Sequence, residues 1–188
     1  YLGVCLSVTG MALVTHGMTS WAMICLMFAG ICDLFDGAAA RRCRRDEAEK
    51  QFGIQIDSLA DMISFAAFPA VLGFYTVGSW GLPVFMVYVL CAVIRLAWFN
   101  MTANSEGHRE YYQGLPVTYS AVIFPVLWLL NGFIGDFAYS AVTAAVYLAA
   151  ALLFILDVKI KKPRGVWYVI FAVLALLVTA LIIIKEVL

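Results

Sequence analysis

The chain consists of long apolar runs that are separated by short polar segments. Seven runs approach the length of about 20 residues that a helix needs to cross a membrane. They cover approximately residues 1–16, 20–42, 54–77, 82–103, 116–134, 138–156 and 167–185. The breaks between them are rich in Gly, Asn, Asp and basic residues, which favour turns and loops. The pattern predicts an all-α integral membrane protein, a bundle of about six to seven transmembrane helices.

Composition supports this prediction and limits the function classes. Of the 188 residues, 64% are hydrophobic and 13% are charged, which is too apolar for a soluble protein and suits a single membrane domain, 1–188. The formal net charge of zero argues against nucleic acid as a partner, because nucleic-acid-binding domains present a basic face. The five cysteines form no CxxC pair and four of them lie in apolar segments, so we expect small hydrophobic side chains of the core. Since the chain starts at Tyr1 within an apolar run, we also expect that part of the natural N-terminus is missing.

Most basic residues fall on one side of the membrane if the seven segments alternate in direction. Ten of the twelve share that side, whereas Arg95 lies within a segment and Lys185 lies at the opposite end. The ten are Arg41, Arg42, Arg44, Arg45, Lys50, Arg109, Lys159, Lys161, Lys162 and Arg164. Cytoplasmic loops carry the excess of Lys and Arg, and such loops also meet anionic lipid head groups. We therefore expect a multi-pass protein of a prokaryotic cell membrane, with the loop between Asp33 and Asp61 in the cytoplasm.

Four aspartates flank the most charged stretch of the chain, residues 33–61. Asp33 and Asp36 are three residues apart and Asp57 and Asp61 are four apart, so each pair shares one face of a helix. A short loop makes the two helices antiparallel neighbours, so the four carboxylates can face one pocket. One uncompensated carboxylate in a spanning helix costs about 2.5–3.5 kcal/mol, and four cost on the order of 10 kcal/mol. Two divalent cations would compensate them; the alternative is a set of aspartates that only accept hydrogen bonds.

The residue types around these aspartates indicate which ligand they suit. An oxygen-only set favours Mg²⁺, Mn²⁺ or Ca²⁺ over zinc, because no His or paired Cys lies nearby. Gly37, Ala40 and Gly53 continue the two aspartate stripes and indicate that something flat approaches the backbone closely. Asp33 lies about eight residues, or roughly 12 Å at helical rise, before the arginine cluster. We therefore expect a site inside the membrane, near its cytoplasmic face.

The motif Asp33-x2-Asp36-Gly37-x2-Ala40-Arg41, followed by Gly53-x3-Asp57-x3-Asp61, resembles the signature of the CDP-alcohol phosphatidyltransferase family. The chain departs from the family in one spacing. Residues 42–52, between the arginine and the second glycine, are about one helical turn longer than is usual in the family. Arg44 would restore the usual distance to Gly53, so either Arg41 or Arg44 fills the family's arginine role.

The resemblance implies an activity and a role for each motif residue. CDP-diacylglycerol would donate its phosphatidyl group to an alcohol, and CMP would leave. Asp33, Asp36, Asp57 and Asp61 would bind two divalent cations, Mg²⁺ or Mn²⁺. Asp61 would also accept the proton of the attacking hydroxyl, a task that suits a positioned carboxylate; alternatively, it only binds metal. The CDP moiety would be bound by Gly37, Ala40, Gly53 and either Arg41 or Arg44.

Three further blocks resemble the membrane-embedded phosphatidylserine synthases within this family. They are Asp57-Ser-Leu-Ala-Asp61-x2-Ser64-Phe65 with Pro69, then Arg95-Leu-Ala-x-Phe99-Asn100, then Gly114-Leu115-Pro116, while Trp98 stands where an Arg is common. This resemblance implies L-serine as the acceptor. Arg95 would bind the serine carboxylate or the lipid phosphate, because guanidinium binds such groups through two points. A simple ion pair between Arg95 and a site aspartate is the alternative.

Other function classes stay open on the sequence alone. A sister enzyme could use glycerol 3-phosphate or inositol phosphate, although such anionic acceptors call for more cations. A cation transporter could also hold ions with membrane aspartates, although the chain shows no internal repeat or pair of broken helices. An inactive scaffold is disfavoured, because every motif aspartate is present.

Two features bear on packing rather than on chemistry. Pro69 either kinks the third segment and opens space beside Asp61, or it is a tolerated membrane proline. Ala141, Ala145 and Ala149 recur at four-residue spacing and form either a homodimer contact or a packing face within the bundle. The expected partners are CDP-diacylglycerol, L-serine, membrane lipids and, through the alanine face, a second copy of the chain.

Overall fold

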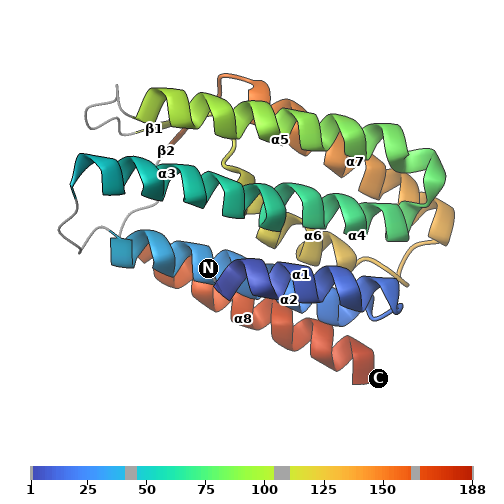
Figure 1. Cartoon of the computed structure of the whole chain (residues 1–188). Coiled ribbons are helices and arrows are strands. Elements are labelled where there is room, and N and C mark those ends of the chain that lie inside the picture. The colour runs from blue at the N-terminus through green and yellow to red at the C-terminus, as the bar shows by residue number, and fades with distance from the viewer. Residues whose placement is uncertain (1, 41–45, 104–110, 162–165, 188) are drawn as a thin grey trace.

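The structure, a computed structural model, describes residues 2–40, 46–103, 111–161 and 166–187 (Figure 1). Helices dominate it, at positions close to the predicted apolar segments. In chain order the elements are α1 (Leu2–Thr15), α2 (Thr19–Ala40), α3 (Glu47–Asp61), η1 (Met62–Ala67), α4 (Phe68–Val77), η2 (Ser79–Gly81), α5 (Leu82–Ala103), β1 (Tyr111–Gln113), η3 (Val117–Tyr119), α6 (Ser120–Trp128), α7 (Asp136–Ile155), β2 (Lys159–Lys161) and α8 (Val166–Val187). Of the shorter helices, η1 is a π-helix, and η2 and η3 are single 3₁₀ turns.

Several helices have the length and composition of membrane spans. In the described residues, four stretches are long and apolar enough: Thr19–Asp36, Glu47–Val77, Ser79–Thr102 and Asp136–Ile155. The apolar helices Leu2–Thr15 and Val117–Trp128 are shorter. α8 has 22 residues, about 33 Å at helical rise. The helical membrane architecture thus agrees with the prediction, whereas the count of six to seven crossings stays a prediction.

The third predicted segment begins earlier than its apolar run indicated. Asp46 caps α3: its side chain accepts a hydrogen bond from the Glu49 N–H (2.7 Å), and its own N–H donates to the Glu49 carboxylate (3.0 Å). This capping box satisfies donors that the first helical turn leaves without a partner. The helix therefore starts at Glu47 rather than near residue 54, because a capped polar turn can extend a membrane helix into water.

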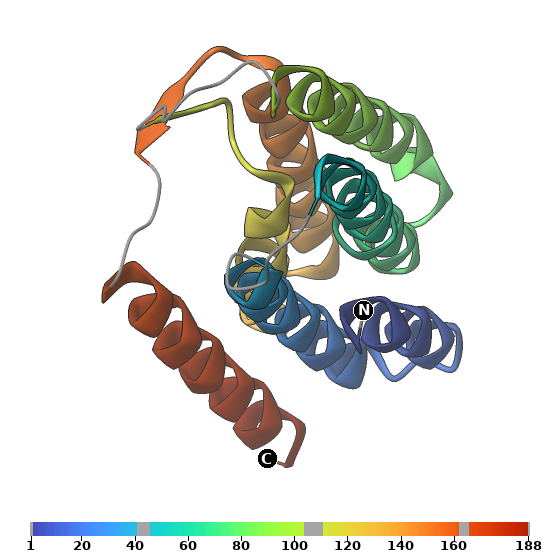
Figure 2. The same cartoon turned by 60° about the vertical axis from the view of Figure 1, so that its left-hand side comes forward.

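Two short strands depart from a purely helical fold. β1 pairs antiparallel with β2, with Tyr111 opposite Lys161 and Gln113 opposite Lys159. Both strands lie in polar breaks that the hydrophobic pattern assigned to loops. Their pairing ties the loop after α5 to the loop after α7 (Figure 2).

The described helix ends that adjoin the long polar segments lie at one end of the bundle. The ends of α2 and α5 and the start of α3 lie on the left of Figure 1, whereas the connections from α4 to α5 and from α6 to α7 lie on the right. Helices that alternate in direction produce this arrangement, which was the premise of the predicted charge asymmetry. Seven of the ten basic residues predicted for one side lie outside the described residues: Arg41, Arg42, Arg44, Arg45, Arg109, Lys162 and Arg164.

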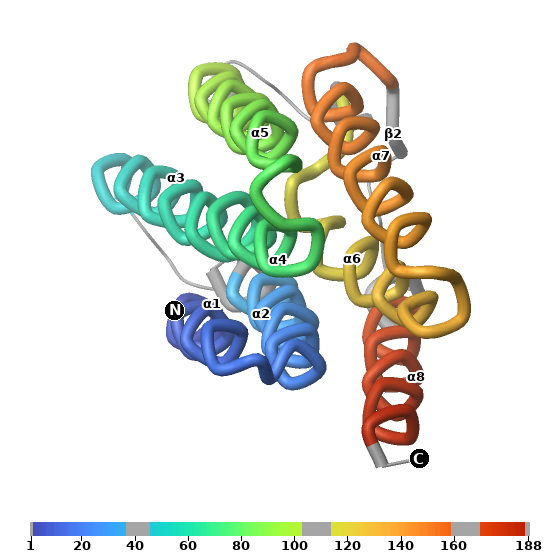
Figure 3. The backbone as a smooth tube through the Cα atoms, turned by 90° about the vertical axis from the view of Figure 1, so that its right-hand side faces the viewer, coloured from blue at the N-terminus to red at the C-terminus, as the bar shows by residue number. Residues whose placement is uncertain are grey.

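α8 packs against α2 and α6 and lies below α7 in Figure 3, and Figure 2 shows that it stands apart from α7, the helix that precedes it. Near its end, Lys185 Nζ donates to the carbonyl oxygens of Trp128 (3.4 Å) and Leu129 (3.3 Å), and to that of Asn131. The same ammonium lies 4.3 Å from the centroid of the Trp128 ring. Carbonyls at a helix end lack partners within the helix. Lys185, the basic residue predicted for the opposite side, thus ties α8 to the end of α6.

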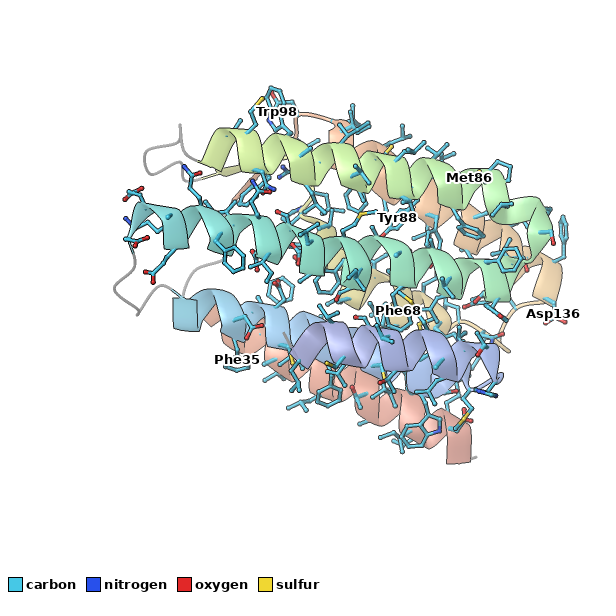
Figure 4. The ribbon with its side chains drawn as sticks, in the orientation of Figure 1. Phe35, Phe68, Met86, Tyr88, Trp98 and Asp136 are labelled. Carbon is cyan, nitrogen blue, oxygen red and sulfur yellow. The ribbon has the colours of Figure 1, made fainter. Side chains whose placement is uncertain are left out.

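Aromatic rings fill the centre of the bundle between α5, α6 and α7. Phe124 and Tyr147 stack with centroids 4.0 Å apart, and Tyr88 meets them edge-on at 5.7 and 5.1 Å. All three side chains are buried. Figure 4 shows Tyr88 pointing from α5 into the bundle and Trp98 of the same helix pointing outward. Buried tyrosines need partners for their hydroxyl groups, and these partners lie on the helix of α3, η1 and α4.

The structure also bears on two predictions about small side chains. Ala145 and Ala149 are exposed, whereas α7 packs inward through other residues. Packing within the bundle is therefore wrong for these two alanines, and the homodimer contact stays a prediction. Of the described cysteines, Cys91 is buried in the core as predicted and Cys25 and Cys32 are partly buried, whereas Cys5 is exposed, so the core prediction is wrong for Cys5.

Candidate functional site

Three of the four motif aspartates line one cavity. Its volume is about 150 Å³, and its walls come from α2, α3, α5 and the chain around η3. Asp33 lies on α2, and Asp57 and Asp61 lie on α3. The lining residues are Asp33, Asp57, Asp61, Arg95, Leu96, Phe99, Pro116, Val117 and Thr118. The antiparallel pairing of α2 and α3 thus brings together carboxylates that are distant in the sequence.

Asp36 stands beside this cavity rather than in its lining. Its side chain is exposed, and its charge acts on Asp33 and Asp57. The carboxyl groups of Asp33 and Asp61 lie close enough together to interact. Among the described residues, no three His, Cys, Asp or Glu side chains come close enough together to hold one metal ion. The structure therefore shows neighbouring carboxylates, and the metal site stays a prediction.

Hydrogen bonds between side chains hold α3 against α5 next to the cavity. Ser58 Oγ donates to Asn100 Oδ1 (2.6 Å), and Asn100 Nδ2 donates to Gln55 Oε1 (3.2 Å). Ser58 is buried between Asp57 and Asp61 along α3. One amide on α5 thus holds two residues that are about one turn apart on α3. Because a rotation of α3 would break both bonds, this contact fixes the face that α3 presents to α2.

Arg95 lines the same cavity from α5 and is only 8% exposed. A charge inside a membrane helix is expected to face a polar cavity of this kind. A second cavity, of about 320 Å³, reaches Arg95 from the side of α7 and is otherwise lined by Ile94, Trp98, Phe154, Ile155, Leu156 and Asp157. A guanidinium carries five N–H donors and can therefore serve several acceptors at once. Beside three carboxylates, it offsets part of their negative charge.

The block Gly114-Leu115-Pro116, which resembles the phosphatidylserine synthases, leads into the cavity wall through Pro116, a position that was not predicted from the sequence. Gly114 has a φ of +79°, and its N–H donates to Val158 O (2.8 Å) while the Leu115 N–H donates to Leu153 O (2.9 Å). A Cβ atom at Gly114 would lie 2.9 Å from Phe154 O, so glycine is required there. These contacts press the chain against the end of α7 and lead residues 116–118 into the cavity wall.

The residues predicted to bind CDP are described only in part. Gly37 and Ala40 lie toward the end of α2. Arg41 and Arg44 lie outside the described residues, so the choice between them stays open. Gly53 is half-buried on α3, one turn before Asp57, and does not line the aspartate cavity. The nucleotide site therefore stays a prediction.

The chemistry of the cavity suits a hard divalent cation. Its charged lining consists of three carboxylates and one guanidinium, and it contains neither Cys nor His. Carboxylate oxygens are the ligands that Mg²⁺ and Mn²⁺ prefer. Carboxylates at membrane depth also require compensation by positive charge. The donor set thus fits the predicted cations.

Known proteins match most of this chain. A CDP-diacylglycerol–serine O-phosphatidyltransferase of Helicobacter pylori is 32% identical over 102 residues, which are 52% of this chain and 43% of that protein. An archaetidylserine synthase of Methanothermobacter thermautotrophicus is 30% identical over 169 residues, 88% of this chain and 65% of that protein. A CDP-diacylglycerol–serine O-phosphatidyltransferase of Saccharomyces cerevisiae is 36% identical over 99 residues, 47% of this chain and 34% of that protein. The chain thus spans less than two thirds of each of these relatives. The profile of one family matches residues 1–156, which include the whole aspartate motif, and the chain therefore belongs to the CDP-alcohol phosphatidyltransferase family.

Proposed function

We propose that this protein transfers the phosphatidyl group of CDP-diacylglycerol to L-serine, which yields phosphatidylserine and CMP. The observation that carries the proposal is the single cavity in which Asp33, Asp57 and Asp61 meet the buried Arg95. Membership of the family supports a CDP-linked donor. Relatives that are named for serine transfer in bacteria and yeast support serine as the acceptor.

Divalent cations belong to this proposal. Asp33, Asp57 and Asp61 would hold them, with Asp36 as the neighbouring fourth carboxylate. Two Mg²⁺ or Mn²⁺ ions would neutralise charge on the donor's pyrophosphate and on the departing nucleotide. The protein supplies a cavity whose lining brings three of the carboxylates together, and the contact of Asn100 with α3 maintains it.

The transfer needs a base for the serine hydroxyl. The hydroxyl oxygen attacks the phosphorus that bears the diacylglycerol group, and the bond from this phosphorus to the oxygen of CMP breaks. CMP leaves with the electron pair of that bond, and the hydroxyl proton passes to the base. Asp61 is our candidate, because it lines the cavity one turn after Asp57 and a positioned carboxylate can accept such a proton.

Arg95 would bind the acceptor or the donor. A serine carboxylate and a lipid phosphate are both anionic, and a guanidinium binds either through two hydrogen bonds. We assign Arg95 to the serine carboxylate, because it is the one cationic side chain in the described lining of the cavity. Gly37, Ala40, Gly53 and either Arg41 or Arg44 would hold the CDP moiety.

The proposal also includes the location of the protein and its orientation in the membrane. Six to seven helices would cross a prokaryotic cell membrane, with the aspartate cavity near the cytoplasmic face. The described ends of α2 and α5 and the start of α3 lie together at one end of the bundle, next to the basic segments of the sequence, and this supports the orientation (Figure 1). The exposed Ala145 and Ala149 on α7 are available to a second copy in a homodimer.

An acceptor panel tests the proposed reaction. Purified protein in detergent is incubated with CDP-diacylglycerol and Mg²⁺ or Mn²⁺, and with L-serine, glycerol 3-phosphate or inositol phosphate in separate reactions. We expect CMP release and phosphatidylserine with serine alone. Transfer to another acceptor would reassign the protein to a sister enzyme. Absence of CMP release in every reaction, combined with Mn²⁺ uptake by proteoliposomes, would favour a cation transporter.

A further inference from the structure

The helix that carries Asp57 and Asp61 has a buried carbonyl whose partner in regular α-helical pairing is missing. An α-helix pairs each carbonyl with the N–H four residues later, and for Phe65 that residue is Pro69, which has no N–H. The proline ring also crowds the same carbonyl. The side chains of Phe65 and Pro69 are buried, and a buried backbone carbonyl requires a partner.

Hydroxyl groups from two other helices reach this carbonyl. Tyr88 Oη on α5 donates to Phe65 O at 2.6 Å. Ser120 Oγ on α6 lies 3.2 Å from Phe65 O and 2.5 Å from Val117 O, so its single hydrogen serves two neighbouring acceptors. Tyr88 and Ser120 are at most 1% exposed. Tyr88 is therefore the main hydrogen-bond donor to the Phe65 carbonyl, and Ser120 is a second donor at a longer distance.

The backbone is widened at this point. Residues 62–67 form the π-helix η1, in which the Phe68 N–H donates to Ile63 O, five residues earlier. Such a segment holds one extra residue per turn, and one residue corresponds to about 100° of rotation in an α-helix. The widened turn therefore sets the direction of Asp57 and Asp61 relative to α4. Phe65 follows Asp61 by one turn, on the same face.

We propose that Tyr88, assisted by Ser120, is a positioning residue for Asp61 and acts by holding the Phe65 carbonyl in the widened turn. Tyr88 does not line the aspartate cavity, so it acts through the backbone. Other contacts hold the two segments that flank η1. The ring of Phe68 on α4 lies against Gly10, and Asn100 forms hydrogen bonds to α3. The Tyr88 hydroxyl holds η1, the widened turn that connects α3 to α4. This inference rests on the proposed function, because it concerns the reaction assigned to Asp61.

Tyr147 offers a matched control. It is equally buried, belongs to the same aromatic cluster, and its hydroxyl donates to Pro69 O at 2.5 Å. This acceptor lies in α4, beyond the widened turn. Tyr147→Phe therefore removes a comparable buried hydrogen bond without affecting the Phe65 carbonyl.

The experiment compares the wild type, Tyr88→Phe, Tyr88→Phe with Ser120→Ala, and the Tyr147→Phe control. Hydrogen–deuterium exchange of residues 57–69 reports on the helix, free Mn²⁺ in electron paramagnetic resonance reports on metal binding, and CMP release reports on turnover. In the double variant we expect faster exchange and Mn²⁺ binding that is weaker by about tenfold, or about 1.4 kcal/mol. Tyr147→Phe should stay within about twofold of the wild type.

Two results would overturn the inference: unchanged exchange in the double variant, or an equal loss of Mn²⁺ binding in Tyr147→Phe. Should the double variant fail to fold, Tyr88→Phe alone answers the question, because it removes one oxygen atom. A wild type that neither binds Mn²⁺ nor releases CMP would instead contradict the proposed function. The exchange data would then still decide whether Tyr88 holds the widened turn.

Discussion

Gly114→Ala should loosen the wall of the aspartate cavity by about 2–5 kcal/mol of unfolding free energy. At a φ of +79°, a side chain with a Cβ atom costs about 1–2 kcal/mol. The new Cβ would also lie 2.9 Å from Phe154 O and 3.1 Å from Leu156 O, so the chain must move away from α7. That movement would break the hydrogen bonds to Val158 O and Leu153 O, each worth about 0.5–1.5 kcal/mol.

Gly132→Ala separates the cost of the positive φ from the cost of losing the contact with α7. Gly132 has a φ of +85°, but no atom lies within 4 Å of a Cβ added there. Its substitution should therefore cost only about 1–2 kcal/mol. The assay is unfolding of both variants in mixed detergent, followed by circular dichroism, together with CMP release. We expect the Gly114 variant to lose more stability than the Gly132 variant and to turn over poorly, because residues 116–118 line the cavity. Equal stability losses would refute the idea that contact with α7 builds this wall.

The remaining predictions concern charge and topology. Asp57→Asn or Asp61→Asn should lower CMP release by about a hundredfold or more while unfolding stays unchanged; full turnover by either variant would remove that aspartate from the mechanism. Arg95→Ala should raise the KM for serine with little change for CDP-diacylglycerol in steady-state kinetics, whereas the opposite pattern would reassign Arg95 to the lipid phosphate. Cys43, in the predicted cytoplasmic loop, should react with a membrane-impermeant thiol reagent in inverted vesicles only, with Cys43→Ser as control; labelling in intact cells would reverse the orientation.

The positions of the helices could be predicted from the sequence. In a membrane, each backbone N–H and C=O must be bonded within its own helix, so an apolar run of sufficient length forms a helix whatever surrounds it. The pairing of Asp57 with Asp61 on one face follows equally from helical periodicity. Local rules also explain the early start of α3, since the capping box of Asp46 and Glu49 is a signal in the sequence that the apolar runs did not include.

The arrangement of the site was decided by tertiary structure. Periodicity could not show that Asp36 stands outside the cavity lining, that Gly114 presses on the end of α7, or that Tyr88 reaches the Phe65 carbonyl. Each of these facts depends on which helices are neighbours. The bilayer drives apolar segments into the membrane but does not favour one helix pair over another, because lipid tails are as apolar as the helix surfaces. The choice of neighbours rests instead on the fit of glycines against rings and on a few buried hydrogen bonds between distant residues, which only the assembled bundle brings together.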